Sequence, residues 1–167
     1  MNKSLKQLLF CVCLFALISH AIADSLSGAE DAYVSGDYEK AAMSYRPLAE
    51  QGDAEAQINL GMMYYRGQGV PQDYLEAATW YRLSAKQGNA FAQFDLGMMY
   101  ENGQGVLQDN TQAYKWLTIA DAKTTDGELK KMAASHRHSI EKQMTADQIA
   151  EAQELARKCT ANKFKGC

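Results

Sequence analysis

The chain has 167 residues, of which 47% are hydrophobic and 22% are charged, enough apolar material for the core of one ordinary globular domain. Its formal net charge is −3 and becomes −5, with 15 basic against 20 acidic residues, once the two lysines of an N-terminal leader are set aside. Because nucleic acids and anionic membrane surfaces select basic patches, neither is expected to be a partner.

Residues 1–23 have the pattern of a secretory signal peptide. Two lysines precede an apolar run at 8–18 that is too short to span a bilayer, and a small-x-small cleavage site ends at Ala23. We therefore expect a periplasmic or secreted protein with no stable membrane insertion after cleavage. A lipoprotein is the alternative, because Cys11 and Cys13 lie in the apolar run, although bulky residues precede both of them.

The next segment, 24–52, is expected to form an N-terminal helical hairpin. A capping-box pattern at Ser27 predicts the start of its first helix, and Gly36 can close that helix in the left-handed conformation. Asp37 then predicts the start of the second helix.

The centre of the chain contains a repeat of 36 residues. Residues 53–88 and 89–124 are identical at 16 of 36 positions, and every strong apolar periodicity in them is helical. Each unit is therefore predicted to be a hairpin of two helices. Because one hairpin cannot bury its apolar face alone, we expect an all-α fold, an α/α solenoid of stacked antiparallel hairpins.

Capping residues and glycines place the helices within each unit. Asp53 and Asp73 predict the two helix starts of the first unit, and Asn89 and Asp109 predict those of the second. A Gly-Gln-Gly turn separates the helices, with the glycines supplying positive φ. A phosphate-binding loop is not expected, since no strand precedes the turn and a third glycine is missing.

Residues 125–167 are expected to form C-terminal capping helices and a tail closed by a disulfide. A polar helix is followed by an amphipathic one, whose start is predicted by Thr145 and which should cover the last unit. Cys159 and Cys167 are the cysteines left after the leader, and in an exported protein such a pair predicts one disulfide. Two free thiols are the alternative.

The repeated pattern resembles the Sel-one-like repeat (SLR) family, a relative of the tetratricopeptide repeat. Leu-Gly-x-Met-Tyr, then Gly-x-Gly-Val, Asp and a helix with Ala and Trp, carry the resemblance over about residues 28–124. In the first unit these residues are Ala56, Leu60, Gly61, Tyr64, Gly67, Gly69, Val70, Asp73, Ala77, Trp80 and Gly88. The resemblance implies a scaffold that binds a protein or peptide in a groove, here expected to be a monomer without a cofactor.

The variable positions of the first helices are the expected binding surface. By analogy with tetratricopeptide units, positions spaced by three, seven and ten residues share the groove face, and methionine suits irregular partners. The expected binding residues are Ile58, Asn59, Met62, Tyr65, Phe91, Phe94, Asp95, Met98 and Glu101. The alternative is that this stripe packs against a neighbouring helix.

An enzyme is not expected, although one alternative function is catalytic. Exported family members include cysteine-rich proteins once described as β-lactamases, which makes a β-lactam- or peptidoglycan-acting hydrolase the alternative. Ser139 and Lys142 match the Ser-x-x-Lys pattern of penicillin-recognising enzymes, but no Ser-Asp-Asn or Lys-Thr-Gly motif accompanies them. His136 and His138 point to different sides of a helix, so no metal site is expected.

Overall fold

The protein is all-α over residues 25–167, the part of the chain that this computed structural model describes. The expected leader at 1–23, with Cys11 and Cys13, lies outside the described residues. Residues 25–34 form a first helical segment. It is followed by α2 (Tyr38–Glu50), α3 (Ala54–Arg66), α4 (Tyr74–Ala85), α5 (Ala90–Asn102), α6 (Asn110–Lys123), α7 (Gly127–Glu141) and α8 (Ala146–Ala161).

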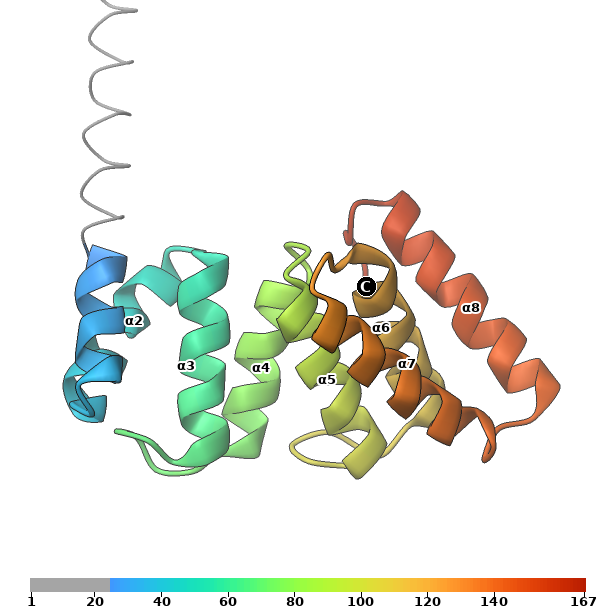
Figure 1. The fold of residues 1–167 in the computed structure, drawn as a ribbon, viewed down its shortest axis with the longest axis horizontal. Helices are drawn as coiled ribbons and strands as arrows, with labels where there is room; N and C mark the ends of the chain where they lie inside the picture. Colours follow the sequence, from blue (N-terminus) through green and yellow to red (C-terminus); the bar gives the residue numbers. More distant parts are fainter. Residues whose placement is uncertain (1–24) are drawn as a thin grey trace, which may run out of the picture.

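Consecutive helices from α2 to α7 pack against one another, which produces the elongated stack of hairpins seen in Figure 1. The predicted α/α solenoid is therefore confirmed. The helix start predicted at Ser27 is wrong, because the first segment is already helical at residue 25 and its local capping pattern is not used. None of the described helices combines the length and the apolar character needed to cross a membrane.

The predicted capping residues begin the helices of both units. The Asp53 carboxylate accepts a hydrogen bond from the Ala56 N–H at 2.7 Å, and the Asn89 side chain accepts from Ala92 at 3.0 Å. These bonds satisfy amide groups that have no partner within their own helix. Local chemistry therefore sets where the helices of each unit start.

Glycine lets the two helices of each unit approach closely. A Cβ on Gly61 would lie 2.8 Å from the Tyr81 ring of α4, and a Cβ on Gly97 would lie 2.9 Å from Leu117 of α6. Both distances are shorter than ordinary contacts, so the large side chain opposite each glycine fills the space that a methyl group would need.

A buried glutamine in each unit binds the helix that precedes the unit. Gln57 Nε2 donates to the carbonyl of Ala49 at 3.0 Å, and Gln93 Nε2 donates to that of Ala85 at 3.1 Å. Both acceptors lie in the last turn of a helix, where carbonyl groups lack intrahelical partners. The glutamine of the repeated Ala-x-Ala-Gln motif is thus a connection between successive hairpins.

The C-terminal helices cover the second unit. α7 packs along α6 and touches α5, and α8 packs on α6. Thr145 begins α8 with the predicted capping box, in which Gln148 is the partner. One buried cluster of this region consists of Phe94, Ala113, Tyr114, Leu117, Ala120, Leu129, Ala133, Ile140 and Ala152.

The chain ends in a tail that returns to the repeats. Cys159 and Cys167 form a disulfide, as predicted. Within the loop that it closes, the Phe164 ring lies 3.0 Å from the position of a Cβ on Gly88, and Lys123 Nζ lies 5.6 Å from the ring centroid. The tail therefore packs where the first unit meets the second.

Candidate functional site

Two adjoining hollows lie between α3 and α5, the first helices of the two units. The larger has a volume of about 360 Å³ and the smaller about 200 Å³. Met62 of α3 and Asp95 of α5 border both hollows, so we treat the two as one groove, the α3–α5 groove. It is lined by Glu30, Glu55, Ile58, Asn59, Met62, Tyr65, Arg66, Tyr81, Asn89, Phe91, Asp95, Met98 and Asn102.

Seven of the nine predicted binding residues line this groove. They are Ile58, Asn59, Met62, Tyr65, Phe91, Asp95 and Met98. Phe91 is 51% exposed, and the Tyr65 hydroxyl donates to Gln104 Oε1 at 3.0 Å. The structure thus brings most of the predicted residues to one surface.

Phe94 and Glu101 do not line the groove, which corrects the sequence-based expectation for their positions. Phe94 is 7% exposed, and its ring forms a T-shaped pair with the His136 ring at a centroid distance of 5.9 Å. Glu101 pairs with the same histidine, with 3.0 Å between Oε2 and Nδ1. The reason is that α7 covers this side of α5.

Asp95 places a largely buried carboxyl group in the groove. No hydrogen bond or ion pair of its carboxylate is found among the described residues, and the first unit carries the neutral Asn59 at the same repeat position. Burial raises the pKa of Asp95 from 3.8 to about 6, and the Arg66 guanidinium opposes this shift. A carboxylate held in this way is a site of attraction for an incoming cation.

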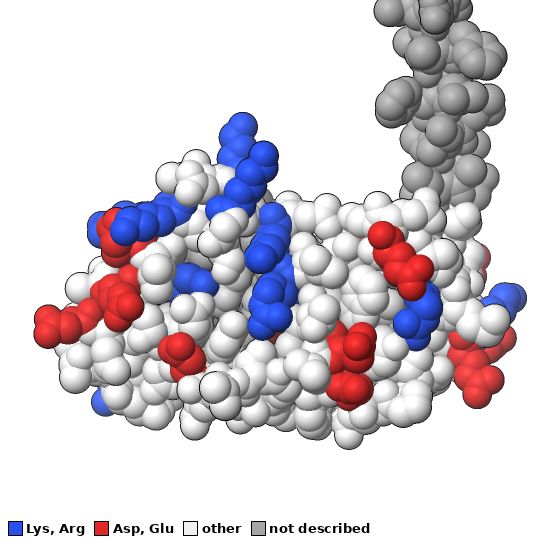
Figure 2. Space-filling view, turned by 180° about the vertical axis from the view of Figure 1, so that it is seen from behind, with Lys and Arg blue, Asp and Glu red and all other residues white. Residues whose placement is uncertain are grey.

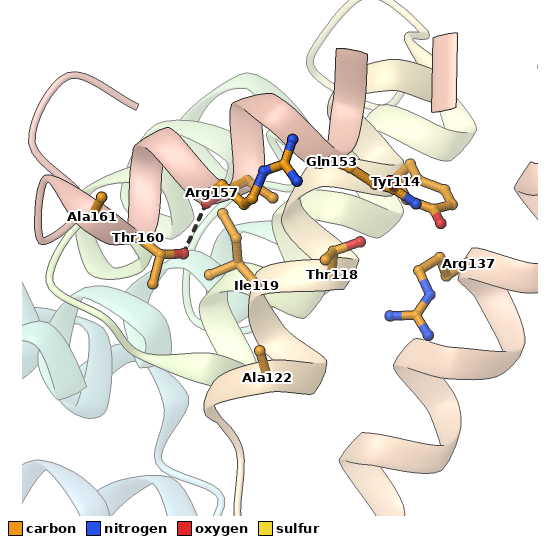
Figure 3. A pocket seen from close by; sticks show the side chains of 10 residues that line it. Tyr114, Thr118, Ile119, Ala122, Arg137, Gln153, Arg157, Thr160 and Ala161 are labelled. Carbon is orange, nitrogen blue, oxygen red and sulfur yellow. Dashed lines mark hydrogen bonds between the residues drawn. The ribbon is translucent and has the colours of Figure 1, made fainter. Parts of the chain in front are cut away.

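Separate from the α3–α5 groove, a hollow of about 660 Å³ lies between α6 and the two C-terminal helices. Figure 3 shows Thr118 and Ile119 on α6, Gln153 and Arg157 on α8, and Arg137 on α7 across the space. Arg137 is engaged by Asp121 at 2.8 Å. No sequence pattern indicates this hollow, because it depends on how α7 and α8 are placed on α6.

The residues of the catalytic alternative do not form a site. Ser139 is exposed on α7 and Lys142 is exposed at its C-cap, and no hydrogen bond joins their side chains. Over the described part of the chain, no three His, Cys, Asp or Glu residues lie together as a metal would require. His136 is paired with Glu101, and His138 lies 3.8 Å from Glu141 on the exposed face of the same helix.

Comparisons with known proteins agree with the repeat pattern. The Sel1 repeat family matches residues 54–89 and 90–120. A protective antigen of uropathogenic Escherichia coli with an SLR fold is 28% identical, with a TM-score of 0.76 over 86% of this chain. A Sel1 repeat protein from Oxalobacter formigenes is 33% identical, with a TM-score of 0.56 over 59%.

This chain covers 31% and 39% of those two solved structures, so it spans well under half the length of either. No curated protein matches the chain.

Proposed function

Because the chain carries two Sel1 repeats on a helical scaffold of the kind that generally mediates protein–protein interaction, we propose that it binds a peptide segment of a partner protein in the α3–α5 groove. The observation that carries the proposal is the set of seven predicted residues that line one groove. Methionines at Met62 and Met98 give this surface side chains that can adapt to a partner.

The chemistry of the groove defines the segment that fits it. Ile58, Met62 and Phe91 offer apolar surface, whereas Glu30 and Asp95 supply negative charge at the same hollow. Arg66 is the basic residue that borders the groove, at its smaller hollow. We therefore propose a segment with apolar side chains around one lysine or arginine, whose positive charge meets the Asp95 carboxylate.

We also propose that the protein works outside the cytoplasm, in a bacterial envelope. The disulfide between Cys159 and Cys167 supports this location, because disulfides persist in oxidising compartments. The leader pattern in residues 1–23 supports it as well.

The test selects 12-residue peptides displayed on phage against the folded protein and then measures the binding of recovered peptides by fluorescence anisotropy. Recovered sequences are expected to carry a lysine or arginine beside apolar residues. Asp95→Asn should weaken their binding about tenfold at pH 7, the loss of one charge-assisted contact. Met62→Ala should weaken it through lost apolar contact.

Matched controls separate the groove from the rest of the surface. Glu151→Gln removes an exposed carboxylate of α8, and Met132→Ala shortens a methionine of α7 that is 47% exposed. Neither control should change the affinity. Peptides whose binding is insensitive to Asp95→Asn and Met62→Ala would place the binding surface elsewhere.

Asp95→Asn should at the same time stabilise the fold at pH 7 by up to about 3 kcal/mol, the value that corresponds to the shifted pKa of Asp95. The folded-state pKa of about 6 is higher than the ordinary value, so the native protein loses stability as pH rises from about 4 to 6. Asparagine removes this penalty, and the gain should vanish below about pH 4. Urea unfolding at pH 7 and pH 4 measures both values, and a variant less stable than wild type at pH 7 contradicts the assignment.

A further inference from the structure

A third hollow, of about 410 Å³, lies between α6, the end of α8 and the disulfide-closed tail. We call it the lysine hollow, because three of its lining residues are lysines. The residues that line it are Gln112, Lys115, Leu155, Lys158, Cys159, Asn162, Lys165, Gly166 and Cys167. Lysine and arginine side chains gather on the rear face of the C-terminal half of the molecule, as Figure 2 shows.

Lys115 is the buried member of this set, with 5% of its surface exposed. Its Nζ donates to Gln112 Oε1 at 2.5 Å and lies 4.4 Å from the centroid of the Trp116 ring. No carboxylate of the described residues forms an ion pair with it. A buried ammonium group without a counter-ion is costly and uncommon in a folded protein.

The surroundings of Lys115 add positive charge. The pKa of Lys115 is lowered to about 8, chiefly by burial and to a smaller extent by the positive charges of Arg82 and Lys86. Asp109 opposes this shift, but it caps α6 through the N–H of Gln112 and is not among the residues that line the hollow. The group is therefore mostly protonated at neutral pH, and the hollow keeps a surplus of positive charge.

The other two lysines leave this surplus in place. Lys158 lies 3.5 Å from Glu154, which is already paired with Arg157 at 2.6 Å. Lys165 has no ion pair among the described residues, and it belongs to the loop that the disulfide closes. The disulfide therefore holds a free cation at the border of the hollow.

We propose that the lysine hollow binds the phosphate group of a small soluble ligand. Lysine is a common phosphate-binding residue that acts as a point charge, and three lysines line this hollow together with no acidic side chain. Gln112 and Asn162 add polar side chains at its border. A volume of about 410 Å³ leaves room for a body attached to the phosphate, as in a sugar or glycerol phosphate. This site does not include any residue of the α3–α5 groove.

The test is isothermal titration of the full chain with glycerol 3-phosphate at pH 7 in low salt. Saturable binding is expected, with a loss of at least tenfold in Lys115→Met, which keeps the length of the buried side chain without its charge. Lys165→Ala should lower the affinity several-fold. Lys130→Ala, an exposed lysine of α7 outside the hollow, is the matched control and should bind as wild type does.

Two further measurements make the result decisive. Affinity should fall as pH rises through about 8, where Lys115 loses its proton, and Lys115→Met should flatten this dependence. Binding that is equal in wild type and in both Lys115→Met and Lys165→Ala overturns the proposal. The proposal is also overturned if Lys130→Ala lowers the affinity as much as Lys115→Met does. It is likewise overturned if acetate binds as tightly as glycerol 3-phosphate. Co-sedimentation with phosphatidic acid vesicles, without binding of the free phosphate, would equally overturn it in favour of a membrane surface.

Discussion

Replacing Gly105 by alanine is expected to lower the free energy of unfolding by more than about 3 kcal/mol. Gly105 has a φ of +67°, and a Cβ there would overlap the backbone carbonyl of Tyr74 at the start of α4. Because backbone cannot rotate away as a flexible side chain can, the loop and α4 would have to separate. Urea unfolding followed by far-ultraviolet circular dichroism measures the loss.

Gly36→Ala is the matched control for the cost of the backbone conformation alone. Gly36 also has a positive φ, +84°, but a Cβ there would meet nothing within 4 Å. This variant should lose only about 1 kcal/mol. Gly69→Ala should behave like Gly105→Ala, since its Cβ would overlap the carbonyl of Tyr38 at the start of α2. Equal losses in all three variants would show that φ alone requires these glycines.

The second glycine of each Gly-Gln-Gly turn has two structural roles: it adopts a positive φ, and it leaves space for the backbone of the preceding hairpin. The sequence predicts the turn and the positive φ, and both glycines of the first turn confirm it, with φ of +68° at Gly67 and +69° at Gly69. The contact with the preceding hairpin is absent from any local pattern. The turn therefore also fixes how closely one hairpin can stack on the previous one.

Local signals predicted the fold well because each repeat unit contains its own helix-capping residues. Asp53, Asp73 and Asp109 begin helices where capping chemistry places them. Ser27 carries the same kind of signal and fails, since a capping pattern stabilises a helix start but does not prevent a helix from passing through it.

The candidate site could be predicted only in part, for a physical reason that Phe94 illustrates. Its spacing places it on the same helix face as Phe91, yet α7, some forty residues later, covers one of them and leaves the other half exposed. Lys115 shows the same effect for a charged residue. It replaces the exposed Thr79 of the first unit and looks like a solvated lysine until α8 and the tail enclose it.

Reduction of the disulfide between Cys159 and Cys167 is expected to lower the free energy of unfolding by about 2.5 kcal/mol. The bond joins residues eight positions apart, and closing a loop of that size removes conformational freedom from the unfolded chain. Urea unfolding with and without reductant measures the change. Cys167→Ala is the control, because reductant should have no further effect on a chain that cannot form the bond.

Hydrogen exchange at the end of α8 distinguishes how the tail is held. The Phe164 N–H donates to the Cys159 carbonyl at 2.9 Å, and its ring packs on Gly88. If the disulfide holds the tail, reduction should speed exchange at Phe164 and in the last turn of α8, while α3 exchanges as before. If exchange and stability are both unchanged, packing of Phe164 on Gly88 suffices to hold the tail. The cysteine pair would then have no stabilising effect on the border of the lysine hollow.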